Sequence, residues 1–210
     1  KVTNGDAGSA LMRDEALAAR ILEAAVRAVS VPVTLKMRTG WDHQELTIKE
    51  CVRAAEYVGC EWVAVHGRTR VQGYRGWADW ELIREVKEHA LIPIIGNGDI
   101  RNGEEAQGRL EESGVNAVMI GRGALRNPWI FKECSGELGP DHVPDRIGLI
   151  LRYLEMLESF HDTRHVLILI RKFIVWLSNG LPGSGEQLGF GMQLAQSDKY
   201  RHNGIYIMLI

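Results

Sequence analysis

The sequence has few cysteines, almost no net charge and no long hydrophobic run, and each shortage excludes a class of protein. Its 210 residues include three cysteines, Cys51, Cys60 and Cys134, which lack the paired spacings of a metal site or a disulfide framework. No stretch reaches the roughly 18 uninterrupted apolar residues of a membrane helix, and the first residues carry no signal-peptide pattern. We therefore expect free thiols, no metal, no membrane association and a cytoplasmic location.

The charge balance leaves the question of nucleic-acid binding open. A formal net charge of -2 gives no polyelectrolyte signature, so any surface for nucleic acid must be a local patch. With 45% hydrophobic and 25% charged residues, the composition is typical of a globular protein that buries a core. Function must therefore be sought in the pattern of residues along the chain.

Four short apolar runs each end at a polar residue or a glycine, at intervals close to the length of a strand, a helix and two loops. The ends fall at Lys36, His66, Asn97 and Gly121. Apolar residues at helical spacing occupy the segments around these runs, over 14–29, 45–58, 79–90 and 103–113. The alternation predicts an α/β fold with parallel strands whose carboxyl ends meet on one face, where we expect a site.

The pattern changes after the fourth strand. Two prolines punctuate a linker, and residues 146–160 and 165–177 then have the periodicity of two amphipathic helices. We predict a boundary near residue 138, with an α/β domain over 1–138 and a small helical domain over 139–182. Residues 183–210 show no clear period, and we interpret them as a divergent tail.

Two cations and a histidine lie at the first two strand ends. Lys36 and Arg38 would bring positive charge to the carboxyl edge, where an anion or an electron-rich ring could be held. The alternative is that the two cations are merely solvated at a loop, and for a lysine considered by itself the two interpretations have equal weight. A lone histidine such as His66 is more often structural than functional. The glycine after it permits close approach of a ligand, and Arg68 and Arg70 offer planar forks suited to phosphate oxygens.

Glycine-containing segments follow the third and fourth strands. Asn97-Gly98-Asp99 and Gly121-Arg122-Gly123 place backbone amides where a phosphate group could be bound, and Arg122 could add a charge-assisted contact. The loop of residues 66–77 mixes arginines, including Arg75, with aromatics. That composition has two interpretations of equal weight: a surface that binds the RNA backbone and stacks the bases, and a packed lid over the site.

Seven stretches of the sequence carry recognisable motifs: Gly8-Ser9-Ala10-Leu11-Met12, Pro32-Val33-Thr34-Leu35-Lys36-Met37-Arg38, Val65-His66-Gly67-Arg68-Thr69-Arg70, Ile95-Gly96-Asn97-Gly98-Asp99-Ile100, Met119-Ile120-Gly121-Arg122-Gly123-Ala124, Asn127-Pro128-Trp129-Ile130-Phe131 and Gly180-Leu181-Pro182-Gly183. With these motifs the chain resembles the bacterial flavin-dependent tRNA-dihydrouridine synthases over roughly residues 1–185. The resemblance implies that residues 1–138 are the C-terminal half of a TIM (β/α)8 barrel, about four βα units, followed by a partial helical domain that binds tRNA.

The resemblance also implies cofactors, a reaction and site residues. Enzymes of this family reduce FMN with NADPH and pass hydride from flavin N5 to C6 of a uridine flipped out of tRNA. Lys36 and His66 are then expected near the isoalloxazine ring, and a second group is expected near the ribityl phosphate: Asn97, Gly98, Asp99, Gly121 and Arg122. The cations expected to contact RNA are Arg38, Arg68, Arg70, Arg75, Arg171 and Lys172.

The proton donor of the family has no counterpart in this chain. That donor is a cysteine in an Asn-x-Gly-Cys-Pro motif shortly before the Lys-Val with which the chain begins, and none of the three cysteines can be carried over to its role. A complete barrel takes about 250 residues. We therefore expect an N-terminally truncated synthase that is inactive alone, with a homodimer or a complementing N-terminal half closing its open edges.

Two other functions remain as alternatives. One is an FMN-barrel oxidoreductase of the dihydroorotate dehydrogenase type, against which the arginine-rich loop and the helical domain argue. The other is a non-catalytic half-barrel that retains only flavin or RNA affinity.

Overall fold

The computed structural model describes residues 7–139 and 141–178, and the chain divides into two compact units. The first unit comprises Lys1–Ala124 and Pro128–Gly139, and the second comprises Leu125–Asn127 and Pro140–Ile210. Our prediction of a divergent tail over 183–210 lies outside the described residues.

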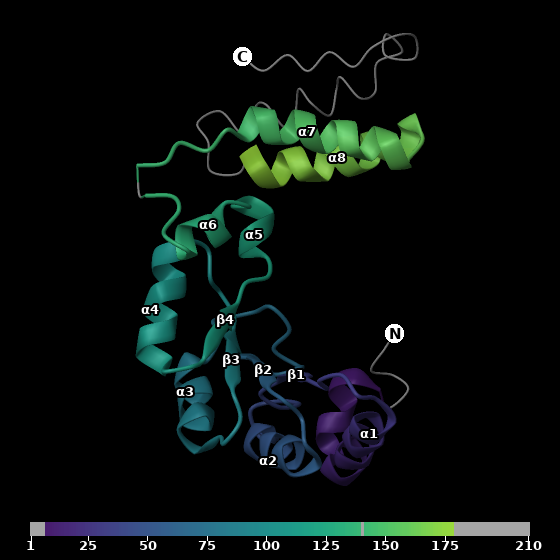
Figure 1. Cartoon of the computed structure of the whole chain (residues 1–210), viewed down its shortest axis with the longest axis vertical. Coiled ribbons are helices and arrows are strands. Elements are labelled where there is room, and N and C mark those ends of the chain that lie inside the picture. The colour runs from purple at the N-terminus through teal and green to yellow at the C-terminus, as the bar shows by residue number, and fades with distance from the viewer. Residues whose placement is uncertain (1–6, 140, 179–210) are drawn as a thin grey trace. The chain divides into compact units, whose positions relative to one another are not determined.

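The first unit is built on four parallel strands that pair in chain order (Figure 1). They are β1 (Leu35–Arg38), β2 (Val63–His66), β3 (Ile94–Asn97) and β4 (Ala117–Met119). The predicted α/β fold with parallel strands is confirmed, but two strand ends differ from the prediction. β1 continues beyond Lys36, and β4 stops before Gly121 because its neighbour in the described sheet, β3, ends at the residue registered with Met119.

Four helices alternate with the strands and follow one another along the sheet (Figure 1). They are α1 (Glu15–Ala28), α2 (Ile48–Val58), α3 (Trp80–His89) and α4 (Gly103–Ser113), and all four were predicted. Side chains of Asp14, Asp79 and Asn102 accept hydrogen bonds from the first-turn N–H groups of α1, α3 and α4. Gly59 ends α2 at φ 92°, a left-handed conformation that glycine adopts without strain.

The core lies between the sheet and these helices. Val63, Val65 and Ile94 are fully buried strand residues that pack with helix residues such as Ile83. Burial of each such side chain contributes about 1.5–3 kcal/mol. Gly96 of β3 belongs to this packing, since a Cβ at that position would lie 2.4 Å from the ring of Trp80.

Three short helices were not predicted, because four to six residues are too few to show a helical period. They are η2 (Gly8–Arg13), a 3-10 helix, and the α-helices α5 (Gly123–Arg126) and α6 (Ile130–Cys134). Ile130 of α6 is fully buried in the core of the first unit.

In the second unit, two helices pack side by side (Figure 1). α7 (Arg146–Phe160) and α8 (Thr163–Ser178) are joined by two residues, and the rings of Tyr153 and Phe173 meet at 4.1 Å between centroids. Both helices were predicted. Arg146 also donates a hydrogen bond to the carbonyl of Leu177 near the end of α8.

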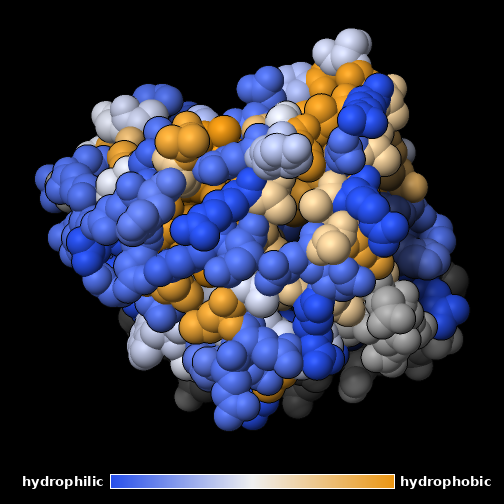
Figure 2. Space-filling model, turned by 90° about the horizontal axis from the view of Figure 1, so that it is seen from below, coloured by the Kyte–Doolittle hydropathy of each residue, from blue (hydrophilic) through white to orange (hydrophobic). Residues whose placement is uncertain are grey.

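Figure 2 views the molecule from the end where α1, α2 and α3 lie in Figure 1, and that face is mostly hydrophilic with hydrophobic groups scattered in between. Within residues 7–139 and 141–178, no helix is long and apolar enough to cross a bilayer. In the same residues, no three or more histidine, cysteine or acidic side chains are grouped to hold a metal ion.

Candidate functional site

The register of the sheet places the candidate residues in one row. Arg38, His66, Asn97 and Met119 are paired across β1 to β4. Neighbouring residues in register project to the same face of a parallel sheet, and so does Lys36, two residues before Arg38 on the same strand. Gly96 faces Trp80, and successive residues of a strand point to opposite faces of the sheet. Asn97 and the rest of the row therefore lie on the face opposite Trp80.

Asn97 joins the polar groups of this row. Its Nδ2 donates to the carbonyl oxygen of Met119 at 2.6 Å, which orients the amide so that Oδ1 faces the neighbouring strands. That oxygen contacts His66 Nδ1 at 2.9 Å and accepts from Lys36 Nζ at 3.3 Å. Three of the four residues predicted to gather at the carboxyl edge, Lys36, His66 and Asn97, are therefore in contact in the structure, whereas Gly121 takes no part in these contacts.

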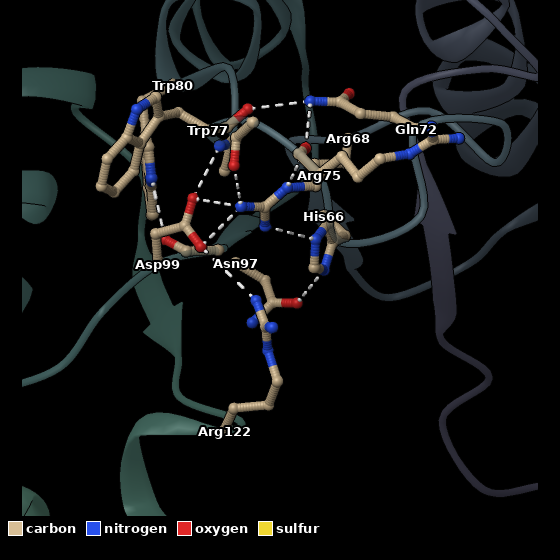
Figure 3. Close-up of polar contacts among 12 residues, drawn as sticks. His66, Arg68, Gln72, Arg75, Trp77, Trp80, Asn97, Asp99 and Arg122 are labelled. Carbon is tan, nitrogen blue, oxygen red and sulfur yellow. Dashed lines mark hydrogen bonds and ion pairs between the residues drawn. The ribbon is translucent and has the colours of Figure 1, made fainter.

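The contacts of His66 with Asn97 and Arg68 determine which ring nitrogen of His66 carries the hydrogen (Figure 3). Because Asn97 Oδ1 can only accept, Nδ1 of His66 carries the hydrogen, and Nε2 is left as an acceptor 3.4 Å from Nη1 of Arg68. Burial, followed by the positive charge of Arg38, lowers the pKa of His66 to about 4, so the imidazole is neutral at pH 7. Burial and Arg38 also lower the pKa of Lys36.

A buried ion pair lies beside this row. Both carboxylate oxygens of Asp99 accept from Nη2 of Arg68, at 2.8 and 2.7 Å, and Oδ2 also accepts from the backbone N–H of Ala78 at 2.7 Å. The side chains of Arg68 and Asp99 are only 2% and 12% exposed. Burial alone would raise the pKa of Asp99, but the hydrogen bonds from Arg68 and Ala78 hold it below its ordinary value.

Arg68, which we predicted to contact RNA, has its partners inside the protein. Its guanidinium also donates to the carbonyls of Gly76 at 2.7 Å and Arg75 at 3.3 Å, so its hydrogen-bonding capacity is used inside the protein. Asp99 likewise faces arginines, with Arg122 Nη2 at 3.5 Å, and a carboxylate so placed organises cations and would repel a phosphate. The two residues form an internal support for the site.

Side-chain hydrogen bonds hold the backbone of the loop after β2, and Figure 3 shows those made by Arg68 and Gln72. Arg38 Nη1 donates to the carbonyls of Thr69 and Gly73, at 2.9 and 3.0 Å. The amide of Gln72 donates to the carbonyls of Arg75 and Trp77, at 3.0 and 3.1 Å. The loop therefore has the internal bonding of a packed lid, while its tip exposes Tyr74, Arg75 and Trp77.

The candidate glycines differ in what they do. Gly98 has φ 141°, and a Cβ there would lie 2.4 Å from the Cβ of Ala78, so close packing of the chain explains this glycine. At Gly121 a Cβ would meet no atom within 4 Å, and the residue is exposed at the carboxyl end of β4. The neighbouring side chain of Arg122 is 56% exposed. Gly121 and Arg122 are thus the members of the predicted phosphate group that remain accessible.

The remaining predicted cations are distributed over both units. Arg70 belongs to the first unit, with its guanidinium 4.7 Å from the ring centre of Trp41. Arg171 and Lys172 belong to α8 of the second unit. Arg171 is half-buried and donates from Nε to the carbonyl of Leu167 at 2.9 Å, whereas Lys172 is exposed.

All three cysteines lie within the described residues as free thiols, and they take no part in these contacts. Cys51 and Cys60 are buried, in α2 and just before β2, and burial raises the pKa of both thiols. Cys134 is exposed at the end of α6, where burial and Glu133 raise its pKa. None of the three is the acid of a site at the strand ends.

Comparison with known proteins assigns this arrangement to a family. The sequence model of the family described as dihydrouridine synthase (Dus) matches residues 1–200. The chain belongs to the dihydrouridine synthase family. A probable tRNA-dihydrouridine synthase of Rickettsia bellii is 45% identical over 195 residues, which are 90% of this chain and 60% of the relative. The tRNA-dihydrouridine synthase B proteins of Pseudomonas aeruginosa and Xanthomonas campestris are each 44% identical over 192 residues, 89% of this chain and 58% of the relative.

The dihydrouridine synthase match has two consequences. The chain spans about 60% of the length of these relatives, so it corresponds to only part of such a synthase. The match also reaches residue 200, and it therefore includes much of the stretch that we interpreted as divergent.

Proposed function

We propose that this chain is the flavin-binding and substrate-facing part of a tRNA-dihydrouridine synthase, which uses FMN and NADPH to reduce uridine in tRNA to 5,6-dihydrouridine. Membership of the family and the names of the relatives support the reaction. The observation that carries the proposal is the convergence of Lys36, His66 and Asn97 at one edge of a parallel sheet. In this proposal the four βα units are the C-terminal half of a TIM barrel.

The chemistry of the side chains fits FMN. Lys36, Arg38 and Arg122 supply positive charge around an imidazole that is itself neutral, which favours an anionic phosphate and a flavin ring that gains negative charge on reduction. Gly121 adds an accessible main chain beside Arg122. When bound, FMN supplies the hydride that NADPH delivers to it.

In this proposal the residues of the chain hold and orient the flavin, and they do not supply the proton for uridine C5. Lys36 is fixed by Asn97 and presents its ammonium group at the carboxyl edge. His66 has its hydrogen on Nδ1, directed at Asn97, and its Nε2 faces Arg68, so it is not an acid at neutral pH. With no cysteine at the site, we infer that residues 1–210 alone form no dihydrouridine and that the donor comes from another part of the enzyme.

Five of the predicted cations remain as RNA-binding candidates. Arg75 and Lys172 are exposed, and Arg38, Arg70 and Arg171 are half-buried. We propose that these groups contact the phosphates and bases of tRNA, and we withdraw Arg68 from the set.

Two assays on the purified chain test this function. Titration with FMN, followed by quenching of flavin fluorescence, should show binding that Lys36→Ala weakens at least about tenfold, the loss expected for one charge-assisted contact. Lys49→Ala is the matched control, because Lys49 pairs with Glu85 between α2 and α3 and not at the strand ends. Absence of flavin binding by the unchanged chain would contradict the cofactor assignment.

The second assay is mass spectrometry of nucleosides from unmodified tRNA incubated with the chain, FMN and NADPH. We expect no dihydrouridine from residues 1–210 and a strong signal from a full-length relative assayed in parallel. Dihydrouridine made by the chain alone would show that one of its own groups protonates C5.

A further inference from the structure

Three aromatic side chains at the carboxyl end of the sheet each lie against arginine. Trp41, which follows β1, has the guanidinium carbons of Arg13 and Arg70 at 5.1 and 4.7 Å from its ring centre. Such distances are those of cation–π contacts. Backbone bonds join the two loops involved, since the N–H of Val71 donates to the carbonyl of Trp41 at 2.9 Å.

The loop after β2 provides the other two aromatic residues. Tyr74 has Arg122 at 4.3 Å and Arg38 at 5.9 Å from its ring centre, and Trp77 has Arg101 at 5.6 Å. We call Trp41, Tyr74 and Trp77 the aromatic rim. Its arginines come from loops or strand ends after β1, β2, β3 and β4 and from η2, so the rim borders the row formed by His66 and Asn97.

Two members of the rim are strongly exposed. Tyr74 is 64% exposed and Trp77 is 71% exposed, although large aromatic side chains usually contribute most of their surface to a core. This exposure is not the result of a loosely held loop, because Arg68, which is paired with Asp99, and the amide of Gln72 donate hydrogen bonds to backbone carbonyls of the loop. The loop backbone is therefore held in place while the two rings face solvent.

We propose that the aromatic rim binds unstacked bases of single-stranded RNA on either side of the base that enters the site. Aromatic rings and guanidinium planes are the two surfaces on which unpaired bases stack. Arg13 and Arg101 are paired with Glu45 and Glu105, so the 56% exposed side chain of Arg122 is the rim cation best placed to contact a phosphate. Because every ring of the rim carries a guanidinium, an RNA strand matches it better than the apolar core of a protein interface does. The inference rests on the proposed function in taking RNA as the substrate, and it assigns RNA binding to the α/β unit itself.

Binding of a labelled oligouridylate, measured by fluorescence anisotropy at low ionic strength, tests the rim. Tyr74→Ala and Trp77→Ala should each weaken binding about tenfold, which corresponds to the loss of one stacked base. Tyr74→Phe and Trp77→Phe should bind as the unchanged chain does, because the ring is retained. Tyr57→Ala is the matched control, since Tyr57 is 91% exposed on α2 and has no place in the rim.

The outcomes separate this inference from the proposed function. If the chain binds FMN but Tyr74→Ala and Trp77→Ala leave RNA affinity unchanged, the inference fails and the flavin assignment stands. If RNA affinity falls as expected while the unchanged chain binds no FMN, the rim stands and the proposed function fails. No measurable RNA binding, or an equal loss in Tyr57→Ala, would also overturn the inference. Circular dichroism of each variant reports whether its fold is retained, and the phenylalanine variants keep the test decisive.

Discussion

Removal of the buried guanidinium of Arg68 should destabilise the first unit strongly. Arg68→Met keeps most of the side-chain volume but leaves the carboxylate of Asp99, 12% exposed, without its main partner. Breaking a buried pair in this way costs about 3–5 kcal/mol. We expect the lower part of that range, because the N–H of Ala78 at 2.7 Å and Arg122 at 3.5 Å still compensate Asp99.

Urea unfolding followed by tryptophan fluorescence measures this loss, since five of the six tryptophans lie in the first unit. Lys49→Met is the matched control. It removes one partner of the Lys49–Glu85 pair, whose side chains are 43% and 44% exposed, and should cost less than about 1 kcal/mol.

The pH dependence of the same measurement identifies the carboxylate. The pKa of Asp99 is lowered in the folded protein, so its contribution to stability is present above the unfolded pKa of about 3.9 and is lost as the pH falls through the folded value. The difference in the free energy of unfolding between the unchanged chain and Arg68→Met should therefore become smaller below about pH 4. An equal cost for Arg68→Met and Lys49→Met at pH 7 would refute the buried-pair reasoning.

Two further predictions concern the sheet. In an NMR titration, the imidazole of His66 should carry its hydrogen on Nδ1 and show a pKa near 4. Because this pKa is below the unfolded value, the free energy of unfolding should decrease as the pH falls from about 6.5 to about 4. Asn97→Asp should raise the pKa of His66, and an unchanged value would contradict the contact with residue 97. Gly96→Ala should cost about 1–3 kcal/mol in urea unfolding, because the added methyl group collides with Trp80, whereas Gly108→Ala within α4, where no atom lies within 4 Å, should stabilise by up to about 1 kcal/mol. Equal effects of the two glycine replacements would argue against the packing described for β3.

The order of the elements was predictable from the sequence because apolar runs and helical periods alternate four times. Parallel strands leave only one edge for their carboxyl ends, so the meeting of Lys36, His66 and Asn97 was also predictable. The end of β4 was not, since its length depends on where its neighbour β3 stops and not on its own residues.

The Arg68–Asp99 pair shows what composition alone hides. Arg68 lies in an arginine-rich loop, and its residue type favours phosphate as much as carboxylate. The deciding information is the register, because His66 pairs with Asn97 and the residues two positions further along face each other. Aligning the predicted strand ends at His66 and Asn97 is therefore the sequence signal that indicates this ion pair.

The amide at position 97 explains how the site keeps its positive charge. Asn97 Oδ1 satisfies both Lys36 and His66 without adding a negative charge, so the imidazole stays neutral and the ammonium is left uncompensated by the residues of the row. An aspartate at this position would pair with Lys36 and favour the imidazolium form of His66. The cations at the strand ends would then be partly neutralised, and their attraction for an anionic cofactor would fall. A neutral hydrogen-bond acceptor is therefore the residue type that orients both side chains while leaving their edge of the sheet electropositive.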